Sequence, residues 1–383
     1  MKAADIFAHG RQIMKKIGRE TKMIITTEDN PRSGEGSFER LRDGRIIFVF
    51  TRFSGSAHDH GCAELFACTS DDEGESWSEP FLFLGRDDAA QNYMSPSLFR
   101  MKSGGLGMIY LRKSKPADGR LLCVPYFRSS DDDGKTWSEQ VPCIDRAGYY
   151  PGVNDSAIVL SSGRILLPTS LMGDGDYKYY SGVVKFCCSD DNGATWKTLP
   201  GEIRSPFDDG AGFVEPFVYE HEDGSLWTWF RTGYNFQYQA RSTDGGESWH
   251  GVSPNLCFTS PDAPMNIKRT GRYTVSIYNP AVRSCLDDKR EAWGSVKRTP
   301  LVCAASDDDG DLFRTEGKTT CNKELDEFFK HVYFLEDDPK ESFCYPAIFG
   351  VEGGFVAAYY HSYGTARCLN CTRLIKVDYD EIR

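Results

Sequence analysis

Short runs of alternating or continuous apolar residues, rather than helical repeats, dominate the hydrophobic pattern of the chain. Typical runs are residues 45–50 (RIIFVF) and 164–168 (RILLP), both rich in strand-forming side chains. Several runs follow an Asp-Gly or Ser-Gly pair, as at Asp43-Gly44, Ser162-Gly163 and Asp223-Gly224. Because such pairs favour tight hairpin turns, the pattern predicts antiparallel strands and an all-β fold.

One segment, S-x-D-x-G-x-x-W, recurs along the chain and is called the box below. Four copies are intact, and a fifth has Phe in place of Trp; they begin at Ser70, Ser130, Ser189, Ser242 and Ser306. The intervals between these starts are 60, 59, 53 and 64 residues. Within a box, Asp can accept hydrogen bonds from its own turn, Gly permits a positive φ, and Trp can pack between neighbouring sheets. The boxes therefore predict repeated hairpin turns that stabilise the fold.

The interval between boxes sets the expected architecture. About 60 residues hold roughly four strands with their loops, which is the size of one β-propeller blade. The 383-residue chain thus predicts a six-bladed β-propeller over residues 23–383, with an early strand around residues 23–27 completing the last blade. Residues 1–22 are expected to form a short helical extension lying on the propeller.

Composition and charge exclude several classes of function. The net charge of −11 disfavours nucleic-acid binding, and an anionic substrate would need a local cluster of arginines. No stretch has the length and apolar character of a signal peptide or a membrane span, so no membrane partner and a cytoplasmic location are expected. Thirteen cysteines then indicate mostly free, buried thiols in a reducing compartment. Neither Cys187-Cys188 nor the Cys368/Cys371 pair has a second close pair at zinc-ligand spacing, so no metal or other cofactor is expected.

From about residue 24 to residue 375, the box-bearing repeat resembles the sialidase superfamily of propellers. In that family the boxes lie on one face, and the functional residues lie on the opposite face around the central channel. A sialic acid carries a carboxylate beside its anomeric carbon, so its site needs converging arginines and a carboxylic acid that protonates the leaving oxygen. The family's nucleophile is a tyrosine with a neighbouring glutamate as its base.

The first predicted blade matches three family positions in order and spacing. The resemblance implies that Arg32 is the first arginine of the carboxylate clamp and that Asp59 is the acid/base. It implies that Arg52 supports Arg32 or the Asp59 loop, while the alternative for Asp59 is an ordinary loop carboxylate. The chain departs from the family at Pro31-Arg32-Ser33, where Arg-Ile-Pro is usual.

The later blades supply the remaining candidates. By resemblance, Glu215 is the base, Arg231 and Arg298 complete the arginine clamp, and Tyr345 is the nucleophile. Arg283 and Lys297 compete with Arg298 for its position.

Three further groups of polar residues lie at predicted blade starts or beside Asp59. Asn154 and Asp155 are candidates for contacts with substrate hydroxyls, and turn formation is their alternative role, as it is for Gln91-Asn92. His58 and His60 flank Asp59 and are weaker candidates for ligand contacts.

These residues together predict a retaining exo-α-sialidase-like glycoside hydrolase that needs no cofactor and acts on a carbohydrate. Two alternatives stay open: a glycosidase for another acidic sugar, and a non-catalytic glycan- or protein-binding propeller, because a fold does not fix its function. The sequence does not determine the oligomeric state.

Overall fold

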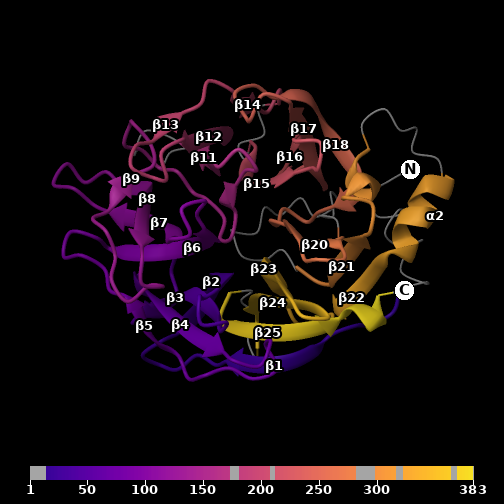
Figure 1. Ribbon diagram of the computed structural model, residues 1–383, viewed down its shortest axis with the longest axis horizontal. Coiled ribbons are helices and arrows are strands. Elements are labelled where there is room, and N and C mark those ends of the chain that lie inside the picture. Colours follow the sequence, from indigo (N-terminus) through magenta and orange to yellow (C-terminus); the bar gives the residue numbers. More distant parts are fainter. Residues whose placement is uncertain are drawn as a thin grey trace.

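The computed structural model describes residues 14–172, 181–207, 212–281, 298–315, 322–363 and 369–382 (Figure 1). In these ranges the chain is built almost entirely of antiparallel strands, as predicted, together with the single α-helix α2 (Asn322–Lys330) and two 3-10 turns, η1 (Asp311–Phe313) and η2 (Tyr379–Glu381). No helix in the described part of the chain is long and apolar enough to span a membrane.

Four of the described sheets are separate and have four or five strands each. Their strands are β1 (Arg19–Ile24), β25 (Cys371–Asp378), β24 (Gly354–His361) and β23 (Phe343–Val351); β10 (Ile158–Val159), β11 (Ile165–Leu171), β12 (Val183–Ser189), β13 (Lys197–Thr198) and β14 (Ile203–Arg204); β15 (Val214–Glu220), β16 (Leu226–Arg231), β17 (Phe236–Ser242) and β18 (His250–Thr259); and β19 (Asn266–Arg269), β20 (Thr274–Tyr278), β21 (Leu301–Ser306) and β22 (Val332–Glu336).

The remaining described sheet is continuous over eight strands. It contains β2 (Arg32–Arg40), β3 (Ile46–Ser54), β4 (Cys62–Ser70), β5 (Phe81–Leu84), β6 (Asn92–Arg100), β7 (Leu106–Ser114), β8 (Leu122–Ser130) and β9 (Val141–Pro142). The prediction of six separate blades is therefore wrong: four sheets stand as separate blades, and one parallel pair, Ala63 with Asn92, joins β4 to β6 in the larger sheet. Each box marks one run of consecutive antiparallel strands, but the box sequence does not predict whether two neighbouring runs are joined by hydrogen bonds.

The sheets follow one another in chain order around a common centre (Figure 1). Strand β2 packs against β6 on one side and β23 on the other, while β15 contacts both β11 and β19. The ring closes in the last sheet, where β1 pairs with β25. The propeller-like arrangement is thus held shut by joining the two ends of the described chain.

The N-terminal prediction is tested only in part, since residues 1–13 lie outside the described residues. Strand β1 begins at Arg19, inside the expected helical extension and four residues before the strand expected around residues 23–27. Its polar side chains pair with charged neighbours: Arg19 with Glu75 and Asp378, and Lys22 with Glu79. These pairs favour the extended backbone in a segment whose sequence resembles the start of a helix.

The boxes form the hairpin turns that their residues predict. In the first box, the backbone N–H of Gly74 donates to Ser70 Oγ over 2.8 Å, and that of Ser76 donates to Asp72 Oδ1 over 2.9 Å. Trp77 is buried with side chains of both the β2–β3 hairpin and the β24–β25 pair, so it packs between two sheets. Each box follows the third strand of a run, after β4, β8, β12, β17 and β21. The boxes thus lie at one end of the sheets, and the inner strands begin at the opposite end.

Candidate active site

The same irregularity occurs near the start of four inner strands. In β2, β6, β15 and β23 the pairing register shifts, and one residue inside each shift has a positive φ of 51° to 56°: Glu35, Ser95, Glu215 and Tyr345. Asp155 and Asp262, which precede β10 and β19, also have positive φ values. A β-bulge of this kind re-aims a side chain that regular pleating would direct onto a sheet face. The six side chains make contacts with residues of other sheets or of neighbouring strands, described next.

Tyr345 lies at the centre of one cluster. Its hydroxyl donates to Glu215 Oε1 over 2.7 Å, and Arg231 Nη1 lies 3.4 Å from the same hydroxyl. Arg231 Nη1 also donates to Glu215 Oε2 over 2.8 Å. The guanidinium carbon of Arg298 is 5.5 Å from the centre of the Tyr345 ring. Three sheets therefore bring a phenol, a carboxylate and two guanidinium groups together.

Asp262 connects the two arginines of this cluster. Its carboxylate accepts from Arg231 Nε over 2.6 Å, and its backbone carbonyl accepts from Arg298 Nη2 over 3.2 Å. Arg298 Nη1 lies 3.3 Å from Cys344 Sγ. Arg231 is only 7% exposed, so its orientation is fixed by two carboxylates rather than by water.

Arg32 belongs to a second, adjoining cluster. Its Nε donates to the Tyr360 hydroxyl over 2.8 Å, and its Nη2 donates to Glu35 Oε1 over 2.7 Å. Its Nη1 donates to Asp59 Oδ1 and, over 3.2 Å, to the carbonyl of Ala57. The Tyr360 ring meets the Tyr345 ring edge-on with 6.0 Å between centres. The two clusters are thus in direct contact through their tyrosines.

The Asp59 loop is anchored on the β6–β7 hairpin. The Asn92 amide donates to the Asp59 and Gly61 carbonyls over 3.0 and 2.9 Å, and Lys113 Nζ donates to the Asp59 carbonyl over 2.8 Å. Although partial burial raises the pKa of the Asp59 carboxyl, the charges of Arg32 and Lys113 more than offset this effect and lower the pKa to about 2. Asp59 is therefore a carboxylate in the free protein at neutral pH.

Tyr345 has the opposite electrostatic setting. Burial, and then the charge of Glu215, hold the pKa of Tyr345 well above its ordinary value, while Arg231 and Arg298 act in the other direction. The hydroxyl is therefore neutral, and Glu215 is the group that can accept its proton.

Comparison with known proteins places the chain in a family. The family model described as "BNR repeat-like domain" matches residues 44–358, which is most of the chain. The chain belongs to the sialidase/BNR-repeat superfamily. A protein of Paraclostridium sordellii named "Sialidase" is 26% identical over an alignment of 241 residues that covers 57% of this chain and 57% of that protein. The "Anhydrosialidase" of Macrobdella decora is 26% identical over 205 residues, covering 44% of this chain and 25% of that protein. The matched region is thus less than two thirds of either relative.

Solved structures have the same fold. The intramolecular trans-sialidase from Ruminococcus gnavus, solved with oseltamivir carboxylate, has a TM-score of 0.66 at 15% identity and covers 93% of this chain and 96% of that one. A protein of unknown function from Dyadobacter fermentans has a TM-score of 0.67 at 18% identity, covering 94% and 99%. At these identities the likeness extends to the fold alone.

In this superfamily member, the structure groups six of the nine predicted site residues. Tyr345, Glu215, Arg231 and Arg298 form the first cluster, and Arg32 and Asp59 belong to the second. Arg283 and Lys297 lie outside the described residues, so their competition with Arg298 is not resolved.

The other three predicted residues lie apart from both clusters. The Arg52 guanidinium stacks on Phe66 at 4.8 Å, and within the described residues neither a hydrogen bond nor an ion pair joins it to Arg32 or Asp59. Asn154 donates to the Gly36 carbonyl over 2.7 Å, and the Asp155 carboxylate accepts from Ser37, Asn266 and the Ile348 N–H. Asn154 and Asp155 are at most 3% exposed and their contacts join sheets, and their contact with a substrate stays a prediction.

The histidines beside Asp59 differ from each other. His58 is exposed at the loop surface, whereas His60 is partly buried and its ring meets Tyr149 at 6.2 Å. Burial and the Lys113 charge lower the pKa of His60 to about 4, so its ring is neutral at neutral pH. Their contacts with a ligand stay a prediction.

Four residues of the two clusters were not predicted from the sequence: Glu35, Lys113, Asp262 and Tyr360. Two features of the sequence could have identified Glu35 and the other positive-φ residues near the starts of the inner strands. Glu35, Ser95, Asp155 and Glu215 follow one another at intervals of 60 residues. Proline also follows three of the six positive-φ residues directly, at Ser95, Glu215 and Tyr345.

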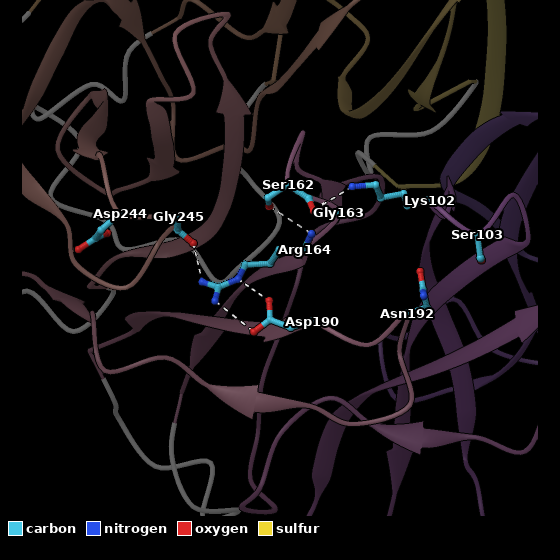
Figure 2. A pocket seen from close by; sticks show the side chains of 9 residues that line it. All are labelled: Lys102, Ser103, Ser162, Gly163, Arg164, Asp190, Asn192, Asp244 and Gly245. Carbon is cyan, nitrogen blue, oxygen red and sulfur yellow. Dashed lines mark hydrogen bonds and ion pairs between the residues drawn. The ribbon is translucent and has the colours of Figure 1, made fainter.

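A hollow of about 650 Å³ is lined mainly by box and hairpin-turn residues (Figure 2). Its wall includes Asp190, Asn192, Asp244 and Gly245 of two boxes, together with Arg164, which donates to Asp190 Oδ1 over 2.8 Å. Because boxes lie at the strand ends opposite to Tyr345, this hollow is separate from the two clusters.

Metal binding has no support in the described residues. There, no three His, Cys, Asp or Glu side chains are grouped as a metal site would require. Cys187 and Cys188 are buried thiols, and Cys368 of the predicted Cys368/Cys371 pair lies outside the described residues. The absence of a cofactor stays a prediction.

Proposed function

We propose that the chain is a retaining exo-α-sialidase-type glycoside hydrolase that releases a terminal sialic or related acidic sugar. The observation that carries the proposal is the 2.7 Å hydrogen bond from Tyr345 to Glu215, with Arg231 3.4 Å from the same hydroxyl. A phenol beside a carboxylate base and two arginines suits attack on a sugar that itself carries a negative charge. The curated relatives named as sialidases support the same class of reaction.

The first half of the reaction forms a bond to Tyr345. Its oxygen attacks the anomeric carbon while its proton passes to Glu215. Since the nucleophile is neutral, it is not repelled by the substrate carboxylate, as an aspartate would be. The glycosidic C–O bond breaks, and its electron pair stays with the leaving oxygen, which takes a proton from Asp59. In the second half, Asp59 removes a proton from water, which attacks the anomeric carbon, and the Tyr345 oxygen recovers its proton from Glu215.

The arginines bind the substrate carboxylate in this proposal. Arg231 and Arg298 lie beside Tyr345. Arg32 binds Tyr360, whose ring is in contact with the Tyr345 ring, so Arg32 belongs to the adjoining cluster. A guanidinium group forms paired hydrogen bonds with a carboxylate, so three guanidinium groups select an acidic sugar. The two buried carboxylates Glu35 and Glu215 limit the excess positive charge around the site.

Hydrolysis of a fluorogenic α-sialoside tests the proposal. Tyr345→Phe is expected to reduce turnover to background, and Asp59→Asn is expected to reduce kcat by about 10²–10⁴-fold, the usual contribution of a general acid. Tyr126→Phe and Asp145→Asn, at a partly buried tyrosine and an exposed aspartate outside both clusters, are the matched controls and should retain full activity. Normal cleavage after either of the first two changes would show that the roles are wrong.

A panel of aryl glycosides separates the alternatives. Cleavage of another carboxylated sugar, with none of the sialoside, would identify a different acidic substrate. Binding of sialylated glycans without cleavage of any member of the panel would identify a non-catalytic propeller.

A further inference from the structure

In the described part of the free protein, four of the five N–H groups of Arg32 donate hydrogen bonds. Each of its three nitrogens donates a hydrogen bond: Nε to Tyr360, Nη2 to Glu35, and Nη1 to Asp59 and the Ala57 carbonyl. Two carboxylates are therefore bound to one guanidinium group. One N–H of Nη2 remains, so a substrate carboxylate can form paired hydrogen bonds with Arg32 only by replacing one of these partners.

The two carboxylates are not equally replaceable. The Glu35 side chain is 4% exposed, and it accepts further hydrogen bonds from Ser95 Oγ over 2.5 Å and from Tyr360 over 3.2 Å. The Asp59 side chain is 56% exposed and lies in the loop between β3 and β4. Moving Glu35 would leave buried donors without acceptors, whereas Asp59 can turn towards water. The Asp59 side of Arg32 is thus the side that can exchange.

We infer that Asp59 holds, in the free protein, the place on Arg32 that a substrate carboxylate takes, so that binding of an acidic sugar releases Asp59 to act as the acid. This inference rests on the proposed function, and it adds the means by which the substrate prepares its own proton donor. The loop itself need not move, because Lys113 and Asn92 bind the Asp59 backbone carbonyl rather than its side chain.

The exchange changes the charges that face Asp59. In the free protein the cations that face Asp59 are Arg32 on β2 and Lys113 on β7, and the titratable His60 lies in its own loop. Once the substrate carboxylate neutralises Arg32, the strongest influence that keeps Asp59 ionised is lost, while burial remains. Its pKa then rises from about 2, and Asp59 takes up a proton from solvent. That proton is the one delivered to the leaving oxygen.

A neutral sugar cannot cause this exchange, because it offers Arg32 no charge in place of Asp59. The arrangement therefore adds specificity at the chemical step: a sugar without a carboxylate would leave the acid ionised even when it occupies the site. Selection of this kind differs from simple attraction of anions by the arginines, since it acts on the protonation of Asp59.

Proton uptake on binding of N-acetylneuraminate tests the inference. Titration calorimetry in two buffers of different ionisation enthalpy, at pH 4.5 and 5.5, measures the protons taken up for each sugar bound. The native protein should take up a fraction of a proton that grows as the pH falls, up to one. Asp59→Asn should abolish this uptake and bind the sugar several-fold more tightly, because the competing carboxylate is gone. Asp59→Ala should show the same loss of uptake.

His60→Asn is the control, since His60 adjoins Asp59 in the loop and its pKa of about 4 lies close to this range. It should retain the uptake of the native protein. Binding without uptake, uptake that persists in Asp59→Asn, or uptake that is lost in His60→Asn would each overturn the inference and leave the proposed function standing. Failure of the native protein both to bind N-acetylneuraminate and to cleave any carboxylated member of the glycoside panel would overturn the proposed function and the inference together.

Discussion

Replacing Asp155 with Ala is expected to lower the free energy of unfolding by about 3–5 kcal/mol, the range seen when one partner of a buried charged group is removed. The Asp155 carboxylate is 3% exposed and accepts hydrogen bonds from three strands. Its donors are Ser37 Oγ at 2.8 Å, Asn266 Nδ2 at 2.9 Å and the Ile348 N–H at 3.2 Å. Lys268 Nζ lies 3.4 Å away. The residue thus connects β2, β19 and β23 across the centre of the ring.

The magnitude follows from the donors that lose their acceptor. Each buried donor left without a partner costs about 1–3 kcal/mol. Asn266 retains a second acceptor, the Pro346 carbonyl at 3.0 Å, and Ser37 can rotate its hydroxyl, so the Ile348 N–H carries the largest penalty. Asp155→Asn keeps one acceptor oxygen and tolerates the positive φ of 58°, so it should retain about half of the lost stability.

Urea unfolding followed by tryptophan fluorescence measures the effect. Asp145→Ala, at an exposed aspartate, is the control and should change the free energy of unfolding by less than about 0.5 kcal/mol. The reasoning would be refuted if Asp155→Ala retained native stability while its KM for a sialoside rose. That result would favour the substrate contact predicted from the sequence.

Two further changes test the turn of the first box and the electrostatics of Asp59. Gly74→Ala should destabilise the protein by about 2 kcal/mol more than Gly44→Ala. Both glycines have a positive φ, but only at Gly74 would an added Cβ lie 2.3 Å from Val356 Cγ1. Thermal unfolding of the two variants measures the difference in stability. Since the pKa of Asp59 is lower in the folded protein than the ordinary value of 3.8, its stabilisation is present above about pH 4 and is lost as the pH falls towards 2. The native protein should therefore be more stable than Asp59→Asn at pH 5, by about 1 kcal/mol after allowance for solvent exposure. In urea titrations this difference in unfolding free energy should shrink between pH 5 and pH 3. A difference that grows as the pH falls would contradict this account.

The repeated boxes predict local structure well because their hydrogen bonds are local. Ser70, Asp72 and Gly74 form their turn from residues only a few positions apart, so the sequence alone specifies it. The joining of β4 to β6 depends instead on one pair of residues in different runs, Ala63 and Asn92, and no motif encodes it. Helix α2 was missed although Leu325, Phe328 and Phe329 have the spacing of one helical face.

The candidate site shows the same division. Glu215, Arg231 and Tyr345 could be named because the boxes give positions to count from, and the structure brings them into contact. Asp155 has the residue type and strand position of a substrate ligand, and the structure also buries it between sheets, where it joins β2, β19 and β23 in a way that the sequence did not predict. Burial of that kind depends on the packing of β2, β19 and β23, which are far apart in the sequence.

Each cluster contains a tyrosine that is bound to a glutamate, so residue type alone does not identify the proposed nucleophile. Glu35 and Glu215 both have φ of 51°, and each accepts hydrogen bonds from one arginine and one tyrosine. By hydrogen bonding alone, Tyr360 beside Glu35 is nearly equivalent to Tyr345 beside Glu215. Burial separates them: Tyr360 is 0% exposed, whereas Tyr345 is only partly buried. The greater exposure of Tyr345 therefore supports the proposal that Tyr345 is the nucleophile, whereas the Tyr360 hydroxyl accepts from Arg32 Nε.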